Sequence, residues 1–190
     1  ISANWTPNNT DFPEIPQFER PEESTVYFYD VPGAKQSVLA FGAPGLSAKD
    51  ADFYPAEVMN YRLGGGGFAS RLTQELREGK GYTYGIRSGF SDRSYIGPFM
   101  ISSGVRSNIT YEATELVRDI LKNYHETFAQ EDLDVTKSYM IKSNARKFET
   151  LGVKLNMLRE ISDYGYEYDY IKDQEQQVED LSVMDIQDLA

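Results

Sequence analysis

The chain has 190 residues, of which 19 are Lys or Arg and 30 are Asp or Glu, so its formal net charge is -11. Its length and its 40% share of apolar residues suit one large domain with a hydrophobic core. The absence of cysteine excludes disulfides, thiolate metal ligands and a cysteine nucleophile, and the acidic balance argues against a nucleic-acid partner, which needs clustered basic residues.

The first 23 residues have the composition of an extended arm or linker, and we expect residues 24–190 to form the folded domain. Four of the eight prolines of the chain lie in this arm, where apolar periodicity is weak. Two segments of strand composition follow, at 25–30 and 36–42, with a Pro-Gly turn signal at 31–34 between them. This pattern predicts a first antiparallel hairpin.

A run of glycines separates the next two predicted helices. Ser47 and Asp50 have the spacing of a capping box, which predicts a helix from there to about residue 62. Each glycine in the run disfavours a helix by about 1 kcal/mol relative to alanine, so the run ends this helix. The following helix places Phe68, Leu72 and Leu76 on one face. The glycines of the run are Gly64, Gly65, Gly66 and Gly67.

The rest of the chain predicts one more hairpin and then helices. Strands are expected at 82–90 and 95–105, joined through residues 91–94. Helices are expected from Thr110 to Phe128, at 131–148 and at 151–164, and a capping box at Ser182 begins another. This order predicts an α+β fold with a mostly antiparallel sheet and helices packed on one face. No apolar run approaches the roughly 18 residues of a membrane span.

Few residues of the chain suit catalysis. Metal-binding motifs such as HxxEH need two histidines one helical turn apart, and this chain has only His125. Arg77 and Tyr84 flank a short glycine turn, so a guanidinium and a phenol can face the same side and donate to a peptide carbonyl or an oxyanion. The alternative is structural, with Tyr84 in the core in phase with Ile86 and Arg77 at a solvated helix end.

The segment LGGGGFASRLTQELREGKGYTYGI, residues 63–86, resembles the second, zinc-free domain of the insulinase or pitrilysin-type metallopeptidases, a group that includes the mitochondrial processing peptidase. The resemblance rests on the glycine run, on Ser-Arg-Leu at 70–72, on Leu-Arg-Glu at 76–78, and on Gly81 and Tyr84. A looser similarity extends from about residue 24 to the end of the chain.

The resemblance implies half of a clam-shell peptidase, with zinc, its HxxEH ligands and the general base in the other half. Arg77 and Tyr84 match the pair that completes such a site, where the arginine holds the peptide and the tyrosine supports the tetrahedral intermediate. The glycines at 64–67 would shape the cavity for an extended peptide substrate. We therefore expect no cofactor in this chain, a zinc-bearing homologous domain or subunit as its partner, and no activity of this chain alone.

The same family contains non-catalytic members, so the alternative function is a structural or peptide-binding homologue of the same fold.

The chain begins with Ile1 and ends within a predicted helix, which indicates part of a longer protein whose targeting signal, if any, lies outside it. Periplasmic and cytoplasmic locations both fit.

Overall fold

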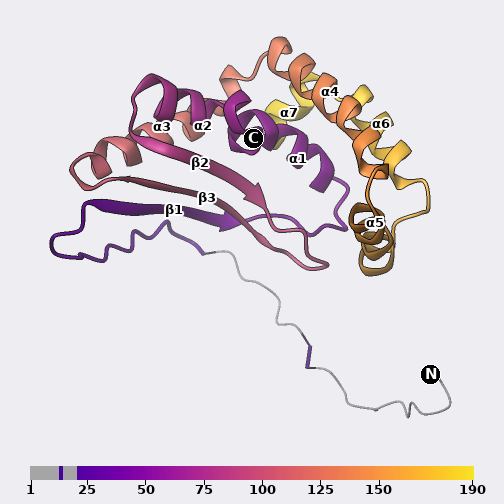
Figure 1. Ribbon diagram of the computed structural model, residues 1–190, viewed down its shortest axis with the longest axis horizontal. Helices are drawn as coiled ribbons and strands as arrows, with labels where there is room; N and C mark the ends of the chain where they lie inside the picture. The colour runs from indigo at the N-terminus through magenta and orange to yellow at the C-terminus, as the bar shows by residue number, and fades with distance from the viewer. Residues whose placement is uncertain (1–12, 15–20) are drawn as a thin grey trace.

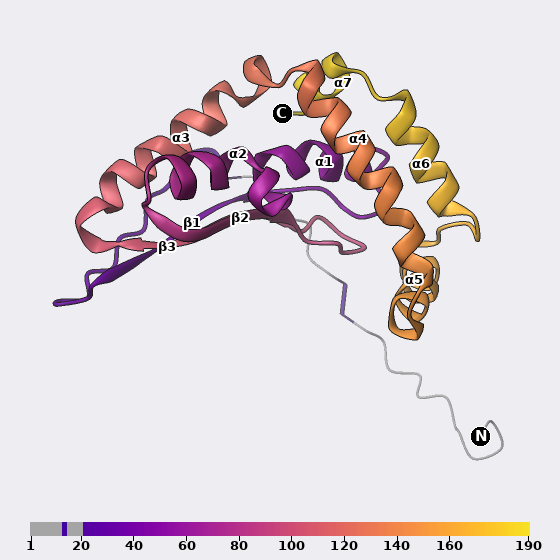
Figure 2. The ribbon, with the colours of Figure 1, turned by 45° about the horizontal axis from the view of Figure 1, so that its top comes forward.

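The computed structural model describes residues 13–14 and 21–190, so most of the predicted arm at 1–23 lies outside the described residues. The described part combines one antiparallel sheet with helices on one face of it (Figures 1 and 2). This arrangement confirms the predicted α+β class. None of its helices is both long and apolar enough to cross a membrane.

The sheet has three strands in the order β1-β3-β2, and both pairs are antiparallel. The strands are β1 (Gln36–Pro44), β2 (Thr83–Phe90) and β3 (Pro98–Arg106). The hairpin predicted between residues 82 and 105 is therefore confirmed. On the covered face Ile86, Ile101 and Val105 are buried. The open face carries Val38, which is 84% exposed, and Met100, which is 41% exposed, together with several small residues.

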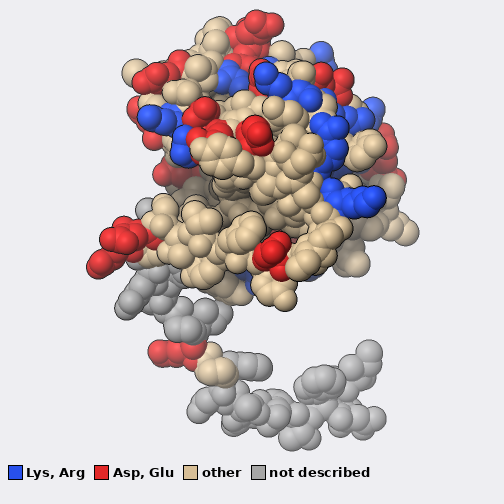
Figure 3. Space-filling model, turned by 90° about the vertical axis from the view of Figure 1, so that its left-hand side faces the viewer, with Lys and Arg blue, Asp and Glu red and all other residues tan. Residues whose placement is uncertain are grey.

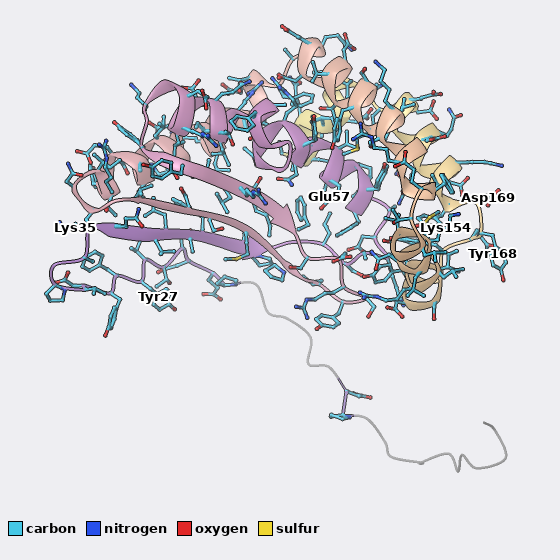
Figure 4. All side chains as sticks on the ribbon, in the orientation of Figure 1. Tyr27, Lys35, Glu57, Lys154, Tyr168 and Asp169 are labelled. Atoms are coloured by element: carbon cyan, nitrogen blue, oxygen red, sulfur yellow. The ribbon has the colours of Figure 1, made fainter. Side chains whose placement is uncertain are left out.

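The first predicted hairpin is wrong. The turn at 31–34 does form, with the amide of Ala34 donating to the carbonyl of Val31 at 3.1 Å and Gly33 at a φ of 79°. Residues 25–30, however, form no strand, and the side chains at 26–29 are 81 to 92% exposed. Figure 4 shows Tyr27 below β1, directed away from the sheet. Leu39 of β1 is itself only half-buried, so a strand outside β1 would lie beyond the helix layer and bury little apolar surface.

The first helix begins later than its capping signal predicts. Ser47 and Asp50 do form a capping-type hydrogen bond, from the Ser47 amide to Asp50 Oδ2 at 2.8 Å, but it closes a turn, and α1 runs over Phe53–Asn60. Pro55 explains the delay, because proline lacks the amide hydrogen that a helix interior requires and is tolerated in the first turn. The chain then continues as a π-helical turn, η2 (Tyr61–Gly65), and ends in the glycine run.

The second helix is short and irregular. It consists of η3 (Gly67–Ala69), α2 (Arg71–Thr73) and the π-helical η4 (Gln74–Gly79). Leu72 and Leu76 are fully buried as predicted, but Phe68 is 65% exposed. The one-face prediction fails for Phe68 because the chain leaves helical geometry at Ser70, whose ψ is 147°, and this breaks the helical phase.

The second half follows the sequence closely. After the 3₁₀ turn η5 (Ser107–Ile109) come α3 (Thr110–Thr127), α4 (Gln130–Asn144), the 3₁₀ turn η6 (Ala145–Phe148), α5 (Leu151–Tyr164), α6 (Tyr170–Asp180) and α7 (Val183–Leu189). The capping box at Ser182 forms, and Gly165 ends α5 in the left-handed conformation. Thr110 does not cap α3; its hydroxyl bonds to the Ser107 carbonyl and to Ser37 instead.

The core lies between the sheet and the helices packed on it. It includes Leu72, Leu76, Ile101, Val117 and Phe128, each at most 1% exposed. Figures 1 and 2 show α1, α2 and α3 over the sheet. From α3 the chain runs outward through α4 to α5 and returns through α6 to α7, which packs against α1 and α3. The segments that carry the glycine run and Arg77 pack against β2, which carries Tyr84, and α5 lies at the opposite end of the molecule.

Candidate functional site

Tyr84 lies on the surface because of a β-bulge at the start of β2. Thr83 pairs with Val105 and Ile86 with Ser103, so three steps along β2 match two steps along β3. The additional residue reverses the side-chain alternation, and Tyr84 is 88% exposed while Ile86 is buried. The structural alternative, in which Tyr84 belongs to the core in phase with Ile86, is therefore wrong.

Buried hydroxyl groups hold this bulge in place. The Thr83 hydroxyl donates to the Gly104 carbonyl at 2.8 Å and accepts from the Gly85 amide at 3.0 Å and from the Ser103 hydroxyl at 2.9 Å. Ser103 also reaches the Gly85 carbonyl at 3.1 Å. These bonds satisfy polar groups that the irregular ladder would otherwise leave unpaired, so the direction of Tyr84 is fixed by the fold.

Arg77 lies near the end of η4, just before the turn into β2. Buried Leu76 anchors this turn, and Gly81, at a φ of 62°, accepts a backbone conformation that residues with a Cβ rarely adopt. The guanidinium lies 4.5 Å from the centre of the Phe68 ring, and its Nε is 3.3 Å from Glu78 Oε1. Arg77 is 38% exposed, so its guanidinium is held by contacts and still faces solvent.

The structure brings the glycine run beside Arg77 through Phe68, which follows Gly67 directly. In the part of the chain that the structure describes, no hydrogen bond joins Arg77 to Tyr84, and the contacts of Arg77 are with Phe68 and Glu78. Figure 3 views the end of the molecule where β2 begins and shows a broad uncharged area with charged side chains above it. Both donors thus remain available for an external group.

Three of the four glycines of the run occupy positions where a larger residue would be strained or would collide with its neighbours. A Cβ on Gly64 would collide with the Ser88 hydroxyl and lie 2.8 Å from the Ser88 amide nitrogen and 2.9 Å from a Leu72 methyl. A Cβ on Gly66 would lie 2.5 Å from the Tyr61 carbonyl, and Gly67 has a φ of 57°. The run is therefore a tightly packed segment, in contrast to the flexible connector that four glycines alone would suggest.

We expect Gly64→Ala to destabilise the domain by about 1–3 kcal/mol, because the new methyl group has no room against β2. Urea denaturation followed by circular dichroism measures this change. Gly104→Ala is the matched control, since a Cβ there meets nothing within 4 Å, and it should leave the midpoint almost unchanged. Equal midpoints for the two variants would show that the close packing of Gly64 is unimportant.

A partly buried ion cluster holds the same segment from both sides. Arg62 precedes the glycine run and Arg71 follows it, and both guanidinium groups bind the carboxylate of Asp132 at the start of α4. The Arg62 Nε to Asp132 Oδ1 distance is 2.8 Å. Arg71 also donates to the Thr127 carbonyl at 2.6 Å and lies 5.0 Å from the centre of the Tyr124 ring. We call Arg62, Arg71 and Asp132 the arginine clamp.

The arginine clamp keeps Asp132 ionised. Burial acts to raise its pKa, but the Ala129 amide, which donates at 3.0 Å, and the guanidinium groups of Arg62 and Arg71 outweigh burial, so the pKa of Asp132 is lowered. Because the carboxylate accepts from both sides of the glycine run, it links that run to α4. The only sequence signal for this cluster is the pair of arginines that flanks the glycines.

A zinc ion does not fit the described residues of this chain. Within residues 13–14 and 21–190 no group of three or more His, Asp or Glu side chains is arranged to hold a metal ion. His125 is half-exposed, and its Nε2 lies 3.7 Å from Glu126, the carboxylate next to it in sequence.

The segment that carries Arg77 and Tyr84 is part of a longer match to a known family. Residues 2–140 match the model of the peptidase M16 inactive domain. The chain belongs to this family. The resemblance inferred from residues 63–86 is thereby confirmed.

Relatives of this M16 inactive domain include proteins named as zinc proteases and one named as a non-peptidase homolog. The Helicobacter pylori protein named non-peptidase homolog YmxG is 28% identical over 194 residues, which cover 98% of this chain and 43% of that protein. An uncharacterized zinc protease of Bacillus subtilis, also named YmxG, is 27% identical over 139 residues, 73% of this chain and 34% of that protein. This chain thus spans less than half of the length of these relatives. Zinc belongs to the wider family, as the name of the second protein indicates.

Solved structures agree with the fold. The peptidase M16 inactive domain from Pseudomonas fluorescens superposes with a TM-score of 0.76 at 29% identity, over 82% of this chain and 37% of that chain. A protease from Helicobacter pylori superposes with a TM-score of 0.75 at 20% identity, over 84% of this chain and 38% of that chain, which supports the fold alone.

Proposed function

We propose that this M16 inactive domain supplies the zinc-free half of a peptidase site, in which Tyr84 and Arg77 act on a bound peptide. One observation carries the proposal. A bulge held by buried hydroxyl groups directs the Tyr84 phenol into solvent, 88% exposed, at the start of a strand in which Ile86 and Ser88 are buried. Bulges next to active sites often redirect a side chain in this way.

The chemistry of the two side chains suits this role. A phenol is an O–H donor, and a donor aimed at the carbonyl oxygen of a scissile peptide stabilises the charge that develops as the tetrahedral intermediate forms. A guanidinium presents several N–H donors in one plane, so Arg77 can hold a carbonyl of the substrate backbone. The stacked Phe68 ring and Glu78 limit the orientations open to Arg77.

The substrate class follows from the same surface. The uncharged area at the end of the molecule where β2 begins suits the backbone of an extended peptide better than a strongly charged ligand (Figure 3). The packed glycine segment at 64–67 contributes backbone rather than side chains, so it can border the peptide without imposing strong side-chain selectivity. The partner that completes the site is a zinc-bearing homologous domain or subunit.

Arg77→Ala tests the proposal in the complete protein. We expect KM for a peptide substrate to rise about 10- to 100-fold with a smaller change in kcat, because a charge-assisted hydrogen bond to bound substrate is lost. Arg118→Ala on α3, which removes an arginine that is 63% exposed, is the matched control and should change neither constant. An unchanged KM in Arg77→Ala would remove Arg77 from the substrate site.

A second function is favoured by one specific observation. The Helicobacter pylori relative that aligns with 98% of this chain is named a non-peptidase homolog. By that parallel the domain would be a non-catalytic structural or peptide-binding homologue, with Arg77 and Tyr84 outside any chemistry. Zinc analysis of the purified complete protein separates the two functions, since a peptidase must contain the metal and a scaffold need not.

A further inference from the structure

Two arginines lie on the open face of the sheet, the face that the helices leave uncovered. On β2 the side chain of Ile86 is buried, so Arg87, the next residue, points to the opposite face, and it is exposed. On β3 Val105 is buried and the following Arg106 is exposed on the open face for the same reason. The structure therefore places two cations on the face that also carries the exposed side chain of Tyr84.

Neither of these arginines has a carboxylate partner in the part of the chain that the structure describes. The three strands contain no Asp or Glu, although the whole chain has 30 of them and a net charge of -11. By contrast, other arginines of the chain are paired with carboxylates, namely Arg62, Arg71, Arg77, Arg118 and Arg159. The guanidinium groups of Arg87 and Arg106 are therefore free to bind an anionic group from outside.

Tyr84 lies between the two arginines along the sheet. In the register of the sheet Arg87 is opposite Ser102, and β3 continues from there through Gly104 to Arg106. The bulge that contains Tyr84 is level with Gly104. Residues two apart on a strand point to the same face about 7 Å from each other, so each arginine is about one such step from Tyr84 along the strand direction.

The open face has room for the backbone of a peptide. Val38 and Met100 are the large apolar side chains exposed on it, which are few for the contact with a permanent partner, because such contacts are usually more apolar. A Cβ on Gly89 or Gly104 would meet nothing within 4 Å, so the packing of this chain does not itself require glycine there. Glycine within a strand often marks a place where another backbone approaches closely. A transiently bound, extended peptide therefore suits this face better than a permanent partner.

We propose that Arg87 and Arg106 select peptides that carry an acidic side chain on each side of the peptide bond held at Tyr84. The inference rests on the proposed function, because the role given to Tyr84 locates that bond. A guanidinium binds a carboxylate through two parallel hydrogen bonds, which makes it suited to an acidic side chain. Alternate side chains of an extended peptide are also about 7 Å apart, so the selected residues lie about two positions before and after the bond. Since one arginine lies on each side, the selection is the same for either direction of the peptide.

Peptide binding to the complete protein tests this selection. Two fluorescent peptides with amidated C-termini differ only in carrying Glu or Gln at these two positions, and a chelator is present so that neither is cleaved. Fluorescence anisotropy should show that the Glu peptide binds about tenfold more tightly at low salt, since each exposed ion pair contributes modestly. The advantage should shrink at high salt, which screens exposed charges. Equal affinities for the two peptides at low salt would overturn the proposal.

A double variant tests the two arginines themselves. Arg87→Gln with Arg106→Gln should bind both peptides with the affinity that the original protein has for the Gln peptide. Arg118→Gln with Lys122→Gln removes the same charge from exposed positions on α3 and should keep the preference. Circular dichroism checks that each variant is folded. A preference that survives the first double variant would overturn the proposal. So would unchanged peptide binding with a lower Tm of the complete protein, because another part of the protein would then cover this face.

Hydrolysis of the same two peptides, without chelator, separates this inference from the proposed function. Cleavage of both peptides with equal kcat/KM would overturn the acidic selection while the peptidase function stands. Binding with the expected preference but no cleavage of either peptide would support the selection and contradict the peptidase function.

Discussion

Tyr84→Phe in the complete protein is expected to lower kcat by about 100- to 1,000-fold, the usual effect of removing one donor to a developing oxyanion. The ring and its exposure are retained in this variant, so only the phenolic O–H is lost. Because that donor acts mainly in the transition state, kcat and kcat/KM should fall together. Steady-state hydrolysis of a quenched fluorescent peptide measures both constants.

Tyr168→Phe is the matched control for this change. Tyr168 is also 88% exposed, but it lies just before α6, at the end of the molecule opposite to the start of β2, so its hydroxyl should not affect turnover (Figure 4). A Tyr84→Phe protein with the turnover of the control would exclude Tyr84 from the chemistry and favour the non-catalytic function. Loss of activity in both variants would indicate a nonspecific effect of hydroxyl removal.

Asp132→Ala is expected to destabilise the domain by about 2–3 kcal/mol, because it leaves the partly buried guanidinium groups of Arg62 and Arg71 without their carboxylate. The midpoint of thermal unfolding should fall by about 4–12 °C for a chain of this size. Asp134→Ala, an exposed position on the same helix, should have little effect. Similar midpoints for the two variants would contradict the role given to the arginine clamp.

The effect of Asp132→Ala should also depend on pH. The pKa of Asp132 is lower in the folded chain than its unfolded value of about 3.9, so its stabilising contribution is complete above that value. The contribution is lost as the pH falls through the folded pKa. The difference in unfolding free energy between the original chain and Asp132→Ala should therefore be larger at pH 7 than at pH 3, and a difference that is constant with pH would indicate lost packing alone.

The features that sequence predicts well are those with local causes. The helix at 151–164, its end at Gly165 and the capping box at Ser182 all depend on residues within a few positions of each other. The sheet hairpin from 82 to 105 also has a short connection and clear alternation. In each case the hydrogen bonds that define the element join neighbours in the chain, so composition and spacing are sufficient.

The features that sequence misses depend on distant partners. The direction of Tyr84 is set by a bulge that requires Ser103 and Gly104 on the facing strand, and alternation along β2 alone predicts the opposite face. The arginine clamp joins Arg62 to a carboxylate 70 positions away. Residues 25–30 have strand composition, but the helix layer does not extend beyond β1 to bury them. Arg77 and Tyr84 can be chosen as candidate site residues from the sequence, but the solvent exposure of their side chains cannot be predicted from it.

The most direct test of the central proposal is cleavage of a quenched fluorescent peptide by this chain alone, by a zinc-bearing homologous half alone and by the two together, each with and without a chelator. We predict no cleavage by this chain alone and cleavage by the combination that the chelator abolishes. Cleavage by the zinc-bearing half at the same rate without this chain, or no cleavage by the combination, would contradict the proposal that this domain completes a peptidase site.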